Sequence, residues 1–175
     1  MSRKLICLLF AVLWLCAAPA LAQDVSLGAR NFKHLSLAVG NAPPDCRTLV
    51  DQGATLSYIH DYLLKAMGPH FNFVNTDNAP VLMTTFDCLR LTDDTDRGGG
   101  RTVGFAVNIS MRFYRPFHDD LAYIYAATWH KPTLLFIPYR DFNQDYFNEL
   151  LNESLDEFIS LWLAEHAQPL EPGKK

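Results

Sequence analysis

Titratable side chains are most concentrated at one predicted turn, where His118, Asp119 and Asp120 follow one another. A histidine beside carboxylates is a pairing that general acid–base catalysis uses when a reacting group can reach both. The same composition is also the ordinary way to solvate the end of a hairpin. A small hydrolase built on these three residues is therefore an alternative hypothesis, and the sequence assigns no catalytic residue.

A second acidic group, Asp93, Asp94 and Asp96, lies in the stretch TDDTDRGGGR. Hard cations such as Ca²⁺ take several carboxylate oxygens as ligands. The spacing lacks the regular ligand positions and the closing glutamate of an EF-hand, and aspartates with glycines are common in solvated loops. The prediction is a polar connection between strands, with no metal and no other cofactor. The sequence also lacks GxGxxG, P-loop, HExxH, GxSxG and CxxC motifs.

The first 22 residues read as a cleaved signal peptide. Two basic residues precede an apolar run from Leu5 to Leu15, and Ala20-Leu21-Ala22 supplies the small residues of a cleavage site. The run is too short to span a bilayer, and no later stretch is long and apolar enough to do so. We expect one domain over residues 23–167, a disordered tail over 168–175, and a periplasmic or secreted location.

Two cysteines, Cys46 and Cys88, remain after this cleavage. An even pair in an oxidising compartment predicts a disulfide. The bridge closes a loop of about 43 residues, worth about 4 kcal/mol in the chain-entropy model. Neither cysteine has a neighbouring CxxC partner or an adjacent histidine that would favour a metal site.

The chain has a net charge of −4, and the predicted signal peptide contributes only basic residues to that balance. An acidic chain is a poor match for the phosphate backbone, so we expect no nucleic-acid partner. Aromatic residues make up 13% of the sequence. This content favours a packed core rather than disorder.

The element that organises the rest is a predicted antiparallel hairpin over residues 102–138. Apolar residues occupy the odd positions of its first arm, from Val103 to Phe113, as in a half-buried strand. Pro116 predicts the end of this arm, and residues 132–138 predict a short further strand fenced by prolines. An even register would place Met111 opposite Tyr123, Ile109 opposite Tyr125 and Phe105 opposite Trp129.

Other strands are predicted near residues 35–39, at a sheet edge, and over 81–91. Helical spacing predicts one helix over residues 56–67 and a second, with an acidic outer face, after residue 143. Too few crossover helices are present for a parallel sheet. The predicted fold class is α+β, with an antiparallel or mixed sheet of about five strands and two helices packed on one face.

The other sheet face is the candidate for binding. Its predicted residues are mostly small or polar, which suits contact with a protein partner of the envelope: Ala106, Asn108, Ser110, Arg112, Ile124, Thr128 and His130. We therefore hypothesise an exported, non-enzymatic binding or assembly accessory protein of the cell envelope. A second hypothesis is a carrier of a small apolar ligand, held between sheet and helices by Tyr123, Tyr125, Trp129, Phe105 and Trp162. Such aromatic residues ordinarily fill a core instead.

Overall fold

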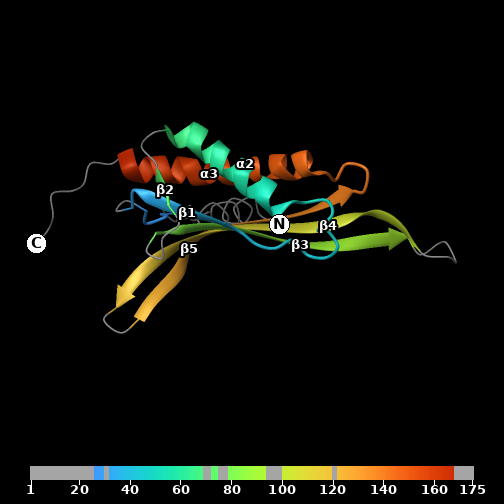
Figure 1. Ribbon diagram of the computed structural model, residues 1–175, viewed down its shortest axis with the longest axis horizontal. Coiled ribbons are helices and arrows are strands. Elements are labelled where there is room, and N and C mark those ends of the chain that lie inside the picture. The colour runs from blue at the N-terminus through green and yellow to red at the C-terminus, as the bar shows by residue number, and fades with distance from the viewer. Residues whose placement is uncertain are drawn as a thin grey trace, which may run out of the picture.

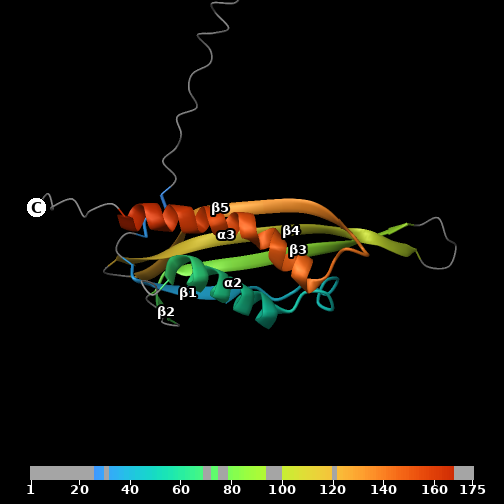
Figure 2. The same cartoon turned by 90° about the horizontal axis from the view of Figure 1, so that it is seen from above.

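The computed structural model describes residues 26–29, 32–68, 72–74, 79–93, 100–119 and 122–167, without the side chains of residues 118, 119, 122 and 123. Two helices cover one face of a five-stranded sheet (Figures 1 and 2). The predicted α+β class is therefore confirmed. The predicted signal peptide and tail lie outside the described residues, and the domain limits stay a prediction.

The strand order is β2-β1-β3-β4-β5. Strand β1 is parallel to both of its neighbours, whereas β3, β4 and β5 form an antiparallel meander, so the sheet is mixed. The elements are β1 (His34–Val39), α2 (Gln52–Met67), β2 (Asn72–Phe73), β3 (Val81–Asp93), β4 (Arg101–Asp119), β5 (Ala122–Pro138) and α3 (Gln144–Ala167).

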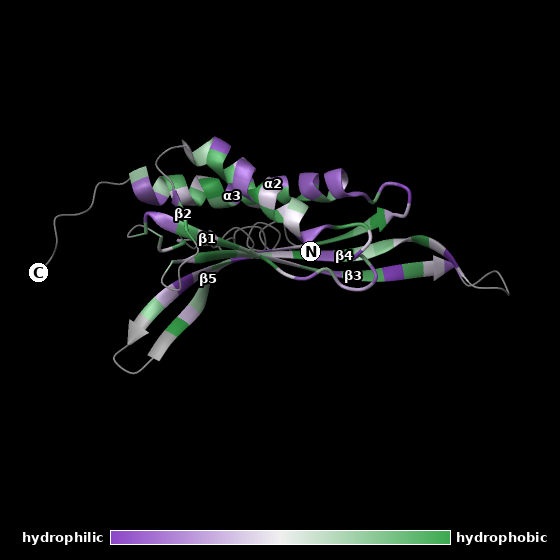
Figure 3. Cartoon of the chain, in the orientation of Figure 1, coloured by the Kyte–Doolittle hydropathy of each residue, from purple (hydrophilic) through white to green (hydrophobic). Residues whose placement is uncertain are grey.

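Each helix begins at a side-chain cap. The Asp51 carboxylate accepts a hydrogen bond from the Ala54 backbone N–H at 2.6 Å, and α2 therefore starts before Gly53, one turn earlier than predicted. The amide oxygen of Asn143 accepts from the Tyr146 N–H at 2.9 Å and starts α3. Hydrophobic residues (green) recur along both helices between hydrophilic ones (purple) in Figure 3. The helical spacing of apolar residues in the sequence predicted this amphipathic pattern for both helices.

The predicted pairing of the long hairpin is wrong. Strand β4 continues through Pro116 to Asp119, and β5 runs without interruption through Pro132. Both prolines are tolerated because each lies at a strand edge without a partner. Pro132 is in β5, the last strand of the sheet, and Pro116 lies beyond Tyr114, the residue at which pairing with β3 ends. The chain thus turns about three residues later than expected. Met111 pairs with Lys131, Ile109 with Thr133 and Phe105 with Ile137.

An irregularity interrupts the β4–β5 ladder. Phe113 pairs with Trp129, but Tyr114 pairs with Ala127, so Thr128 is an extra residue in β5. Such a bulge bends the strand and moves the following side chains to the other face. The hairpin beyond it leaves the plane of the sheet on the side away from the helices (Figure 1).

The core lies between the odd positions of β4 and the two helices. Phe113 is fully buried, with ring centroids 5.5 Å from Phe158 and 6.0 Å from Trp162. Phe105 is packed edge-on against Phe142, at 5.1 Å. The odd-position stripe of the first arm therefore faces the helices, as its alternation predicted.

Two tyrosines of α2 tie the helices to each other. The Tyr58 hydroxyl donates to the Asn152 side chain at 2.6 Å, and the Tyr62 hydroxyl donates to the Asp156 carboxylate at 2.8 Å. The hydrogen bond to Asp156, with burial and the carboxylate charge as smaller causes, raises the pKa of Tyr62 to about 12. The neutral phenol is the form that this contact stabilises.

This contact predicts one unusually basic tyrosine. Because the folded pKa of Tyr62 is raised, its stabilising effect is complete below pH 10 and is lost as the pH rises through about 12. Absorbance titration at 295 nm should show one phenol ionising near pH 12. Asp156→Asn should shift that step toward pH 10, while Asp145→Asn, an exposed change in the first turn of the same helix, should leave it in place. A Tyr62→Phe variant that keeps the late step would refute the assignment.

Candidate functional site

The helix-free face of the sheet carries large apolar side chains in contact with water. The ladders place Leu89 of β3, Ala106 of β4 and Phe136 of β5 in one cross-strand row. Leu134, two residues from Phe136, is 78% exposed, Leu89 is 60% exposed and Phe136 is 56% exposed. We call Leu89 and Phe136, together with Leu134 two residues away on β5, the apolar row. The sequence predicts only a short strand fenced by prolines over residues 132–138, and nothing in that pattern indicates an exposed apolar surface.

A glycine shapes this row. A Cβ on Gly104 would lie 2.5 Å from the Phe136 ring and 2.6 Å from the Ile137 carbonyl oxygen. Real Cβ atoms do not approach so closely, so only glycine lets the Phe136 ring lie against the neighbouring strand. The ring is held in place on the sheet while more than half of it stays exposed.

Polar residues of the predicted partner face lie beside the apolar row. Arg112 pairs with His130, and Ser110 lies two residues before Arg112 in β4. The Ser110 hydroxyl and His130 Nε2 are 2.8 Å apart. A serine and histidine at this distance resemble a nucleophile and its base, but no carboxylate contacts His130 Nδ1 among the described residues, and the Ser110 side chain is buried. The geometry describes a cross-strand polar contact.

The bulge divides the rest of the predicted partner face. Ala106, Asn108, Ser110, Arg112 and His130 share the helix-free side. Thr128, the bulged residue, donates instead to the Leu27 carbonyl at 2.7 Å. Ile124 pairs with Phe117, an odd position of β4, and therefore falls on the other face. The seven residues do not form one continuous surface, because the extra residue in β5 shifts the pairing between the two strands.

The acidic turn is not joined to His130. His118 and Asp119 pair with Tyr123 and Ala122 at the hairpin tip, while His130 pairs with Arg112, six positions from His118 along β4. At about 3.3 Å per residue this separates the two histidines by about 20 Å along the strand. Asp120 and the side chains of His118 and Asp119 lie outside the described part of the structure.

The residues named for an apolar carrier are mostly core. Phe105, Trp129 and Trp162 are buried, and the Trp129 ring contacts Phe158 at 5.8 Å. Tyr125 lies on the projecting part of the hairpin, where its hydroxyl donates to the Ala79 carbonyl at 3.3 Å, and the Tyr123 side chain is not described. Phe105 packs against Phe142, and the two tryptophans pack against Phe158, rather than around a common space.

An ion pair joins the edge strand β5 to α3. Lys131 Nζ lies 2.6 Å from one Glu157 oxygen, and the Trp129 indole N–H donates to the other at 3.1 Å. The hydrogen bond from Lys131 lowers the pKa of Glu157, and partial burial of the carboxylate opposes this effect. The contact fixes the strand under the helix and is directed away from the helix-free face.

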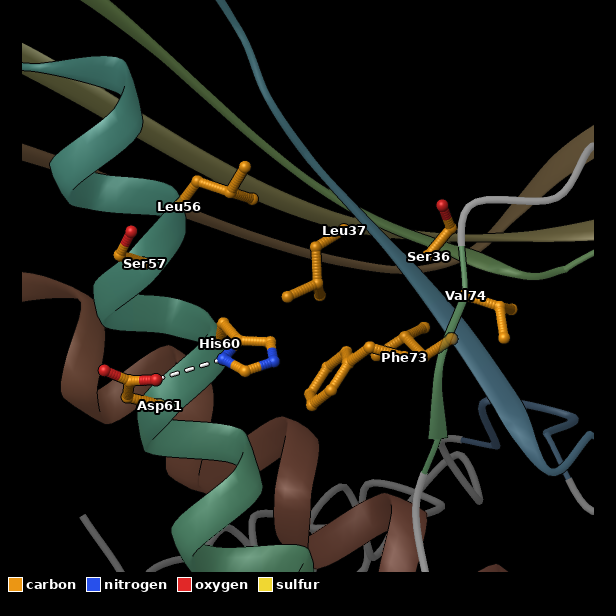
Figure 4. Close-up of a pocket in the computed structure, with 9 residues that line it drawn as sticks. Ser36, Leu37, Leu56, Ser57, His60, Asp61, Phe73 and Val74 are labelled. Atoms are coloured by element: carbon orange, nitrogen blue, oxygen red, sulfur yellow. Dashed lines mark hydrogen bonds and ion pairs between the residues drawn. The ribbon is translucent and has the colours of Figure 1, made fainter.

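A groove of about 560 Å³ opens between α2 and the β1–β2 edge of the sheet (Figure 4). Leu37 and Phe73 face Leu56 across it, and His60 lies at the rim. His60 Nδ1 is 3.0 Å from Asp61 Oδ1, and the imidazole ring lies 4.4 Å from the Phe73 ring. The full lining is Leu35, Ser36, Leu37, Leu56, Ser57, His60, Asp61, Phe73 and Val74.

The groove contains serine, histidine and aspartate, but their arrangement is not that of a catalytic triad. In a triad the histidine nitrogen opposite the carboxylate contacts the serine hydroxyl. In Figure 4 that nitrogen, Nε2 of His60, points toward Phe73, whereas Ser57 lies on the other side of the ring. The Asp61 contact therefore orients the imidazole toward the groove without activating Ser57.

Two further findings hold for the part of the chain that the structure describes. No group of three or more histidine, cysteine or acidic side chains there could hold a metal ion. No helix there is sufficiently long and apolar to cross a membrane. The aspartates at 94 and 96 lie outside that part.

The disulfide between Cys46 and Cys88 is present, as predicted, with the two Cα atoms 6.0 Å apart. It links the turn that follows β1 to the second half of β3. The Cys46 side chain is fully buried.

No protein-family model and no curated protein matches the chain. Among solved structures, a minor lipoprotein from Acinetobacter baumannii is 12% identical, with a TM-score of 0.40, over 74% of this chain and 94% of that one. A neuraminyllactose-binding hemagglutinin homolog from Helicobacter pylori is 8% identical, with a TM-score of 0.41, over 78% and 86%. Rare lipoprotein B from Shewanella oneidensis is 13% identical, with a TM-score of 0.29, over 77% and 93%. Similarity this loose does not establish a common role.

Proposed function

We propose that this is an exported, non-enzymatic binding protein of the cell envelope, which holds a partner protein against its helix-free sheet face. The apolar row is the observation that carries the proposal. Burying one leucine or phenylalanine side chain is worth about 1.5–3 kcal/mol, and this face leaves three such side chains largely in water, on β3 and β5 either side of β4. Contiguous apolar surface rimmed by polar groups is typical of interaction sites.

The surroundings of the row favour a protein partner. Asp87 lies in the same cross-strand row as Leu134, Arg112 and His130 pair four positions away on the same face, and Asp87 and Arg112 bring charges of both signs. Interfaces between proteins combine an apolar centre with such a polar rim. The disulfide and the predicted signal peptide support an oxidising location outside the cytoplasm.

The test is site-specific photo-crosslinking in cells of the source organism. A benzophenone amino acid replacing Leu134 should capture one identified envelope protein, and the same residue replacing Glu149, exposed on α3, should not. Leu134→Asp should then weaken binding of that purified partner at least tenfold, because a buried unpaired carboxylate is costly. The melting temperature of the Leu134→Asp variant should equal that of the native protein, because the native leucine side chain is already exposed.

Two results would overturn the proposal. Capture of lipid alone at position 134 would indicate a membrane surface in place of a protein. Identical products at positions 134 and 149 would show that the apolar row has no specific role.

A further inference from the structure

The groove beside α2 contains a stretch of sheet edge without a partner strand. Strand β2 pairs only with His34 and Leu35, and its last contact is the Val74 N–H donating to the Leu35 carbonyl at 3.1 Å. Among the residues that the structure describes, no strand pairs with this side of β1 beyond Leu35. The open edge lies next to the groove-lining side chains of Leu37 and Phe73 (Figure 4).

The backbone pattern shows which groups face that edge. On the opposite side, the Ser36 N–H donates to the Pro80 carbonyl and the Gly40 N–H to the Thr84 carbonyl, each at 2.8 Å. Residues in a strand point their backbone groups alternately to the two edges. The N–H and C=O of Leu37 and the N–H of Val39 therefore point to the groove. The Val39 carbonyl accepts from the Gln52 side chain, which closes the open stretch.

The side chains around this edge are apolar at the centre and polar at the rim. Leu37 shares the helix-covered side of the sheet with its partner Leu82 and faces Leu56, which is 37% exposed on α2. Phe73 closes one end of the groove. A strand laid along the edge would direct alternate side chains into this space.

We propose that this groove binds a short extended segment of a partner protein, which adds to the sheet as a strand along the open edge of β1. Exposed edge groups are a ready template for such pairing: main-chain hydrogen bonds supply affinity and side-chain pockets supply specificity. The open stretch, from Ser36 to Val39, is bounded at both ends and shorter than an average strand of 5–6 residues. It suits a linear segment better than the edge of a second folded sheet.

The rim adds one element of specificity. His60 Nδ1 contacts Asp61, and the other ring nitrogen, Nε2, points into the groove, where it can exchange a hydrogen bond with a ligand. The bound segment is therefore expected to carry apolar side chains at alternate positions and a hydroxyl next to them.

The test is selection from a random heptapeptide display library on the purified exported protein, with counter-selection on the Leu56→Asp variant. Peptides of alternating apolar pattern should enrich. For the best of them, Leu56→Asp should weaken binding at least tenfold. Leu64→Asp, on the same helix but outside the groove and 43% exposed, should not. Both native leucines are exposed enough for the variants to fold.

A second measurement reports on strand addition itself. Amide hydrogen exchange at Leu37 and Val39 should slow when the peptide is bound. Methylation of the peptide amides that face β1 should abolish binding, because it removes the donors. Failure of any peptide to enrich over the Leu56→Asp variant, or binding that leaves exchange at Leu37 unchanged, would overturn the proposal. Leu134→Asp should leave peptide binding intact, so this result is independent of the helix-free face.

Discussion

Replacing Cys46 and Cys88 together by serine is expected to lower the free energy of unfolding by about 4 kcal/mol. The bridge spans 42 positions along the chain and restricts the unfolded ensemble over that length. The loop that it closes contains α2, β2 and the first half of β3, and the bridge ties the turn after β1 to the meander. Urea denaturation followed by circular dichroism would measure the loss as a lower midpoint.

Reductant provides the matched control. Unfolding the native protein in its presence should reproduce the midpoint of the double serine variant, and that variant should not respond to reductant at all. A double variant within about 1 kcal/mol of the native protein would contradict the expected effect.

Phe113→Ala is expected to cost about 3–5 kcal/mol. The ring is fully buried where β4, β5 and α3 meet, in contact with Phe158 and Trp162, and it directly precedes the ladder irregularity. Its removal leaves a cavity that neighbouring rings cannot fill without leaving their own contacts. Thermal unfolding should show a clearly lower melting temperature.

Phe117→Ala, the same chemical change four residues later in β4, is the control. Phe117 is 44% exposed, and the Arg115 guanidinium lies over its ring, 5.2 Å from the centroid. Its loss should cost about 1 kcal/mol. Equal losses for the two variants would show that burial at Phe113 is not what stabilises the sheet–helix contact.

Sequence patterns predicted most of the fold because its core follows simple periods. Alternation along β4 identified the face that the helices cover, and the stripe that includes Phe147 and Trp162 identified α3. The register of the hairpin could not be predicted, since it depends on where the chain turns, and two prolines suggested breaks that edge positions make unnecessary. Thr128 carries no signature of a bulge.

The candidate sites were harder to predict from the sequence. Leu134 and Phe136 occur in an unbroken apolar run, which is as typical of a fully buried strand as of an exposed edge strand. Their exposure follows from the helices covering only one face. The groove brings together β1, α2 and β2, which are far apart in the sequence. Its open edge consists of backbone N–H and C=O groups, which nearly every residue type has, so residue identity does not indicate it. No sequence signal distinguishes an edge that is short of a partner.

The bulge at Thr128 also marks a boundary at which we expect the molecule to divide into two cooperative units. On one side of it, β4 and β5 belong to a sheet held by β3 and covered by α3. On the other side, beyond Tyr114, β4 pairs only with β5 among the described residues, so the hairpin there is a two-stranded ribbon outside the helix-covered sheet. Two-stranded ribbons have little stability of their own. Local unfolding of this arm therefore needs far less free energy than global unfolding, and proteolysis of the native protein should begin there.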